Sequence, residues 1–142
     1  MGTADNKAVV QAYFDAVNKG HLTDDLLDFM TDDVTWWIQQ ASPSAGLYEG
    51  KAGVKRLFAI DIPIFSAPLA VRILRMVAEG ALVVAEAEIG TRNKDGKAYL
   101  NQYTFWMEIR DGKICAVREY LDTLYAQQVL FDPAGVAPRL HG

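Results

Sequence analysis

Apolar residues recur every three or four positions through the first part of the chain, a spacing typical of amphipathic helices. Three segments show this spacing: residues 4–19, 23–30 and 50–62. Gly20 supplies a stop signal after the first segment, and Pro63 ends the third. The faces of the third predicted helix are marked by Val54, Leu57, Phe58 and Asp61.

The period of the pattern changes in the second half, where segments rich in Val, Ile, Tyr and Phe are separated by short turns. Strands are predicted at 34–38, 69–78, 81–92, 98–110 and 113–123. The link Asp111-Gly112 favours a tight hairpin, so the last three or four strands should form an antiparallel meander. Helices followed by strands indicate an α+β fold. We expect a cone-shaped, curved antiparallel sheet that three N-terminal helices close over an apolar pocket.

The length and charge of the chain restrict its organisation and its partners. The 142 residues fit a single domain spanning 1–142, with a core of about 5–131 and a tail of 132–142. A net charge of −4 and a pI of about 5.1 argue against a nucleic-acid or anionic-membrane partner. The longest apolar run, 65–71, is interrupted by Ser66 and Pro68 and is too short to span a bilayer.

Cysteine and histidine usage bears on the compartment and on metal binding. Cys115 is the only cysteine, so no internal disulfide can form, and a reducing, cytoplasmic location is expected. Its place in a strand beside Val117 indicates a small buried hydrophobic residue. His21 and His141 lie in a predicted loop and in the tail, and no His, Cys or carboxylate spacing resembles a ligand set. Without a phosphate-binding loop or a dinucleotide fingerprint either, we expect no metal and no cofactor.

Alternation along the last predicted strand places Asp122 on the same side as Ile114, Ala116 and Tyr120. On such a largely apolar side, a carboxylate is costly to bury unless it is hydrogen-bonded, and its pKa tends to rise. A raised pKa suits a general acid or base that works near neutral pH. The alternative is that Asp122 caps a helix over residues 124–131, since Asp is a favoured N-cap residue. The two roles are compatible.

Aromatic residues line one side of the 98–110 strand. That side consists of Tyr99, Asn101, Tyr103, Phe105, Met107 and Ile109. Asn101 is the one amide there, and a buried amide must find partners either in the core or in a ligand. Trp36 and Ile38 share one side of the first strand. Trp106 lies on the opposite side of its strand, where it is placed to cover a subunit contact.

Five segments together resemble the nuclear transport factor two-like (NTF2-like) superfamily, and most of all its SnoaL-like branch of polyketide cyclases and ketosteroid isomerase-like proteins. These segments are residues 12–20, 29–33, 48–50, 111–114 and 118–123. The resemblance covers roughly residues 5–131. It implies a cone-shaped α+β barrel with a hydrophobic pocket, and a homodimer packed through the sheet.

The resemblance also implies particular site residues. SnoaL-like cyclases and limonene-epoxide-hydrolase-like enzymes have a pocket aspartate that corresponds to Asp122. The Arg-x-Asp pair of the epoxide hydrolases falls on Ala87 and Ile89, so epoxide hydrolysis by that mechanism is not expected. The oxyanion-binding tyrosine of ketosteroid isomerase corresponds to Tyr13, and its second donor falls near Asn101 or Gln102. The proton-shuttling base of that enzyme falls near Ile38, which cannot act as a base.

These observations lead to two functional hypotheses. The first is a small-molecule enzyme of the isomerase, cyclase or hydrolase type, in which Asp122 moves a proton on an apolar cyclic or carbonyl substrate. Tyr13 and Asn101 would donate hydrogen bonds to a developing oxyanion. The expected substrate-binding residues are Trp36, Ile38, Phe58, Tyr103, Phe105 and Tyr120. The second hypothesis is a non-catalytic binding module for a hydrophobic metabolite, favoured by the missing Arg-x-Asp pair.

Overall fold

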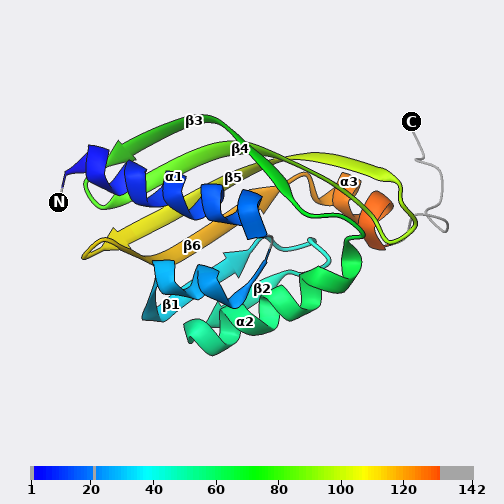
Figure 1. Cartoon of the computed structure of the whole chain (residues 1–142), viewed down its shortest axis with the longest axis horizontal. Helices are drawn as coiled ribbons and strands as arrows, with labels where there is room; N and C mark the ends of the chain where they lie inside the picture. The colour runs from blue at the N-terminus through cyan, green and yellow to red at the C-terminus, as the bar shows by residue number, and fades with distance from the viewer. Residues whose placement is uncertain (1, 21, 132–142) are drawn as a thin grey trace.

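The predicted helical and strand-forming segments assemble into a curved sheet with helices along one side (Figure 1). The structure, a computed structural model, describes residues 2–20 and 22–131. Its helices are α1 (Thr3–Gly20), the 3₁₀ turn η1 (Asp24–Phe29), α2 (Gly50–Asp61), η2 (Ile62–Ile64), α3 (Thr123–Ala126) and the π turn η3 (Gln127–Phe131). Its strands are β1 (Met30–Ile38), β2 (Gly46–Glu49), β3 (Ala70–Glu79), β4 (Leu82–Arg92), β5 (Ala98–Arg110) and β6 (Lys113–Leu121).

The sheet has the order β2-β1-β6-β5-β4-β3. Strands β3 to β6 form the predicted antiparallel meander, and the β5–β6 hairpin turns through Asp111 and Gly112 at φ 53° and 77°. Positive φ at both central residues is the geometry for which Asp-Gly is favoured. Strand β1 joins the free edge of β6 in parallel, so the sheet is mixed and is antiparallel at every other pair of strands. Strand β2, where no strand was predicted, adds an antiparallel edge beyond β1.

Helix α1 lies across the inner side of the meander and covers its core (Figure 1). Strand β5 shows the predicted alternation, with its odd-numbered residues from Tyr99 to Ile109 buried. The ring of Phe14 on α1 packs against Phe105, with ring centroids 5.0 Å apart. At the end of α1, Asn18 donates to the Val71 carbonyl (2.9 Å) and accepts from the Val71 N–H (2.6 Å). This side chain occupies backbone groups of β3 at the edge of the sheet.

Strand β6 contains a bulge that decides which of its residues face inward. Glu108 pairs with Ala116 and Ile109 with Ile114, so Cys115 is an extra residue on β6. A bulge of this kind reverses the alternation that follows it. Ile114 is buried before the bulge and Val117 is buried after it. From Val117 onward, the odd-numbered residues of β6 therefore face the inner side of the sheet.

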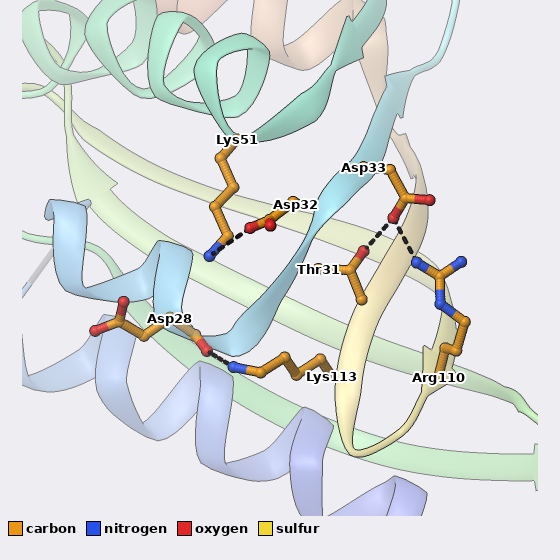
Figure 2. Close-up of polar contacts among 7 residues, drawn as sticks. All are labelled: Asp28, Thr31, Asp32, Asp33, Lys51, Arg110 and Lys113. Atoms are coloured by element: carbon orange, nitrogen blue, oxygen red, sulfur yellow. Dashed lines mark hydrogen bonds and ion pairs between the residues drawn. The ribbon is translucent and has the colours of Figure 1, made fainter.

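The start of β1 is irregular, and polar contacts fix it (Figure 2). Between the pairs Met30–Ile114 and Thr35–Ala116, β1 has several residues for the single residue of β6. Asp33 accepts a hydrogen bond from Thr31 (2.7 Å) and forms an ion pair with Arg110. Both interactions lower the pKa of Asp33. Figure 2 also shows the ion pair of Lys51 with Asp32 and the hydrogen bond from Lys113 to the carbonyl of Asp28. Beyond this segment, Trp36 and Ile38 are buried on the inner side.

Helix α2 approaches β2 closely at Gly53, where a Cβ atom would lie 2.9 Å from the carbonyl carbon of Tyr48. Glycine is therefore needed for this packing. The approach sets the position of the last turn of α2, which ends at Asp61. The predicted tail, 132–142, lies outside the described residues. Within the described residues, no helix is long and apolar enough to cross a membrane.

Candidate functional site

The inner face of the sheet and the helices over it enclose a cavity of about 550 Å³, including its open mouth. Among the described residues, seven aromatic and six aliphatic side chains line it, together with two carboxylic acids, Asp61 and Glu119. A lining of this kind favours apolar ligands. The two carboxylic acids are the groups in it that can transfer a proton.

Glu119 enters the cavity from β6 as a consequence of the Cys115 bulge. The indole Nε1 of Trp36 donates a hydrogen bond to Glu119 Oε1 at 3.0 Å, which fixes the carboxyl group. Burial raises the pKa of Glu119 from 4.5 to about 7, and the hydrogen bond from Trp36 opposes this rise. A carboxyl group that titrates near neutral pH can both accept and return a proton.

Asp61 reaches the same cavity from the C-terminal end of α2. Burial, and secondly the charge of Glu119, raise the pKa of Asp61 well above its usual value. The negative end of the helix dipole acts in the same direction. Within the described residues, no group donates a hydrogen bond to the Asp61 side chain. Its protonated form is therefore favoured beside an ionised Glu119.

Two tyrosine hydroxyl groups complete the polar part of the cavity. Tyr13 on α1 is 2% exposed, and its hydroxyl makes no hydrogen bond with another described residue. Burial, followed by the charges of Glu119 and Asp61, raises the pKa of Tyr13, so the phenol stays protonated. The hydroxyl of Tyr103 lies 2.7 Å from that of Tyr99, and burial raises its pKa well above the usual value. Both groups are hydrogen-bond donors rather than bases.

Five of the predicted site residues line the cavity: Tyr13, Trp36, Phe58, Tyr103 and Phe105. The structure thus brings together the aromatic residues that the alternation pattern and the resemblance singled out. Ile38 is buried but is not among the residues that line the cavity. The functional roles of all these residues stay predictions.

Tyr120 lies on the outer face of the sheet, against Trp37 with ring centroids 5.1 Å apart and beside Arg118. Its predicted place in the pocket is wrong, because the bulge turns the even-numbered residues of β6 outward. Cys115, predicted to be buried, is only partly buried for the same reason, since it is the bulged residue.

Asn101 is buried, but its partners belong to the protein. Its Nδ2 donates to the Tyr99 hydroxyl (2.8 Å) and to the Asp122 carbonyl (3.0 Å), and its Oδ1 accepts from the Gln102 N–H (2.7 Å). Both amide hydrogens are therefore used, which leaves none for a ligand. Of the two alternatives from the sequence, the structure shows the core one. Asn101 does not line the cavity. Its hydrogen bond to the Tyr99 hydroxyl connects it to Tyr103, which does.

Asp122 is exposed, and its predicted position inside the cone is wrong. Its Oδ1 accepts a hydrogen bond from the Tyr125 N–H at 3.1 Å, the geometry of an N-cap of α3. It does not line the cavity, because the alternation that pointed it inward is reversed at Cys115. The capping alternative is confirmed.

We expect Asp122→Ala to lower the free energy of unfolding by about 1 kcal/mol, because the first turn of α3 loses its cap. Asp122→Asn should change it by only a few tenths of a kcal/mol, since asparagine caps equally well. Urea titrations of the two variants and the wild type measure this difference. An equal loss in both variants would show that the charge, and not the cap, is what matters.

Asp61 and Glu119 are the residues that sequence reasoning did not assign to the site. For Asp61 a signal existed, because its spacing from Val54, Leu57 and Phe58 places all four on one helix face. Glu119 gave no such signal, since unbroken alternation places it opposite the apolar side.

A metal site has no support from the arrangement of the described side chains. Among residues 2–20 and 22–131, no group of three or more His, Cys, Asp or Glu side chains converges as metal ligands would. A site without a metal or cofactor stays a prediction.

Comparisons with known proteins agree with this architecture. An NTF2-like protein from Burkholderia xenovorans LB400 is 25% identical, with a TM-score of 0.72 over 92% of this chain and 98% of its own. A proposed SnoaL-like polyketide cyclase from Jannaschia sp. CCS1 is 18% identical, with a TM-score of 0.78 over 96% and 95%. A protein with a ketosteroid isomerase-like fold from Catenulispora acidiphila, in complex with trimethylamine, is 18% identical, with a TM-score of 0.74 over 92% and 97%.

Sequence comparison gives the family directly. No curated protein shows significant sequence similarity to the chain. The SnoaL-like domain family matches residues 10–117, which include most of α1, all of α2 and most of the sheet. The chain belongs to the SnoaL-like domain family, within the NTF2-like fold.

Proposed function

We propose that the protein is a small-molecule enzyme that performs acid/base chemistry without a cofactor in the cavity between the helices and the sheet. The observation that supports this most is Glu119, a carboxyl group held by Trp36 inside an apolar cavity and titrating near pH 7. Environments that push the pKa values of two neighbouring acids apart are typical of acid/base pairs. The isomerase, cyclase and hydrolase types remain the candidate reaction classes.

In this proposal Glu119 takes over the role first assigned to Asp122 and accepts a proton from the substrate. Asp61, whose pKa is raised, stays protonated and donates to an oxygen of the substrate. The Tyr13 hydroxyl, which has no described partner, is available as a second donor to that oxygen. One donor of this kind typically lowers a reaction barrier by about 3 to 4 kcal/mol. The aromatic walls bind the apolar remainder of the substrate.

The test is turnover of a panel of hydroxyketones, enones and epoxides by the wild type and by Glu119→Gln. Conversion that depends on Glu119 supports the proposal. Conversion that is equal in the two proteins removes Glu119 from the mechanism and the proposal with it.

The second candidate is a binding module that holds a hydrophobic metabolite. It is favoured by Ala87, which is fully buried, and by Ile89, which lines the cavity, because the resemblance places the Arg-x-Asp pair of the epoxide hydrolases at these positions. Native mass spectrometry of the purified protein would detect a retained ligand. A retained ligand that is released unchanged, together with no turnover on the panel, supports this candidate over the enzyme.

We also propose that the protein forms a homodimer through the outer face of the sheet. One row of paired residues crosses all six strands: Leu47, Trp37, Arg118, Trp106, Val84 and Val77. Its only charged member, Arg118, stacks on the ring of Trp37 at 3.9 Å. Trp106 is 43% exposed and Val77 is 59% exposed, which leaves an apolar strip for a second copy to cover.

Trp106→Glu should weaken this dimer by at least about tenfold, because a buried tryptophan is a typical interface hot spot. Ile60→Glu is the matched control, since Ile60 is 45% exposed but lies on α2. Analytical ultracentrifugation over a concentration series measures both. A wild-type chain that is monomeric at every concentration would contradict the dimer proposal. The reducing, cytoplasmic location expected from the sequence is a separate point and stays a prediction.

A further inference from the structure

The charge inventory of the cavity is one-sided. Its described lining contains two carboxylic acids, Asp61 and Glu119, and no lysine or arginine. The other titratable groups that the charge of Glu119 reaches are phenols: Tyr13 on α1, Tyr103 and Tyr99 on β5 and Tyr48 on β2. No described side chain therefore supplies positive charge to this pair of acids.

The acids also keep unused hydrogen-bonding capacity. Glu119 accepts one hydrogen bond, from Trp36, although a carboxylate can accept about four. The side chain of Asp61 accepts none from a described residue, although it is partly buried and faces the cavity. Polar groups removed from water without partners are rare, so a group on a ligand is expected to interact with them.

The remaining walls suit a positive charge as well. Tyr13, Trp36 and Phe105 form a continuous aromatic surface, with ring centroids 6.1 Å and 6.3 Å apart from one ring to the next. Ring faces carry negative electrostatic potential and attract organic cations, and tryptophan does so most strongly. A methylated ammonium group is weakly hydrated, so it enters an apolar cavity more readily than a metal ion does.

We propose that the cavity recognises an organic cation, a protonated or quaternary amine that places its charge between Asp61 and Glu119 and its carbon groups against Trp36 and Tyr13. This inference rests on the proposed function, because it assumes that the cavity receives a ligand, and it narrows the substrate class to amines. It also excludes carboxylates and phosphates, which an ionised Glu119 repels.

Three probes of nearly equal shape test the charge preference: choline, 3,3-dimethylbutan-1-ol and 3,3-dimethylbutanoate, which are cationic, neutral and anionic. At pH 8, isothermal titration calorimetry should give choline a dissociation constant at least about tenfold below that of the alcohol, with no detectable binding of the anion. The preference should decrease below pH 7 and disappear near pH 5, because Glu119 becomes protonated.

Glu119→Gln should abolish the preference at pH 8, whereas Glu108→Gln should retain it, because Glu108 is exposed on the other side of β5. Equal binding of choline and the alcohol at pH 8, or a preference that survives in Glu119→Gln, would overturn the inference. The proposed function is tested separately. If turnover of neutral carbonyl substrates depends on Glu119 while choline shows no preference, only the amine assignment fails.

Discussion

Replacing Glu119 with glutamine should reduce turnover of any substrate converted in the cavity by about 10²- to 10⁴-fold. The amide keeps the size of the side chain and still offers Oε1 to the Trp36 indole, so the shape of the cavity is preserved. What is lost is the group that accepts the proton. For the wild type, the rate should rise with pH to a plateau above about pH 7, following ionisation of Glu119. The variant should lack this rise.

Two variants separate this effect from general damage to the fold. Asp122→Asn changes an exposed carboxylate at the end of the same strand and should leave turnover unchanged. Asp61→Asn removes the neighbouring acid, which should lower turnover less than loss of the base does and should leave the pH profile in place, because burial and Trp36 set the pKa of Glu119. A drop in Asp122→Asn as large as that in Glu119→Gln would return the catalytic role to Asp122.

The second large effect of Glu119 concerns stability. Its carboxyl group supports turnover but lowers the free energy of unfolding near neutral pH. Because the pKa of Glu119 is about 7 in the folded protein and 4.5 as a free side chain, the folded state binds the proton more tightly. Between about pH 4.5 and pH 7 the unfolded state therefore carries fewer protons, and the free energy of unfolding falls as pH rises. The loss amounts to about 3 kcal/mol and is complete above pH 7. Asp61, with its raised pKa, adds in the same direction.

Glu119→Gln should remove this dependence, since glutamine does not titrate, and should be more stable than the wild type by up to about 3 kcal/mol at pH 8. Urea unfolding at pH 5 and pH 8 measures the difference between the two proteins at each pH. The exposed control Glu108→Gln should follow the wild type at both values. A variant that is less stable than the wild type at pH 8 would contradict the buried, ionising carboxyl group. A residue that lowers stability while it supports activity is typical of functional sites.

The architecture was largely predictable from local sequence signals. The helical spacing around Tyr13 and Phe14, the alternation along β5 and the Asp111-Gly112 turn each specify a local structure that the fold retains. The parallel pairing of β1 with β6 was not predictable in this way. It joins residues about 80 positions apart, and no turn chemistry records such a pairing.

The site was predictable only in part, and the reason is a single residue. Alternation identified Tyr103 and Phe105 correctly, because β5 is regular from end to end. On β6, unbroken alternation favours Asp122 and Tyr120 over Glu119, because alternation holds only where no residue is inserted. Cys115 and its neighbours do not reveal the bulge, since bulges of this type do not require glycine. The resemblance to relatives with a pocket aspartate reinforced that choice.

The bulge at Cys115 also affects how this chain should be aligned with others of its fold. In β6, the same residues paired without the bulge would bring Arg118 opposite Phe105, the position that Glu119 now occupies. A relative whose strand lacks the bulge would then present a cation in place of a carboxylate, although every residue type in the strand is unchanged. Relatives with nearly identical strands can therefore differ in chemistry, and strand registers deserve comparison before residue identities.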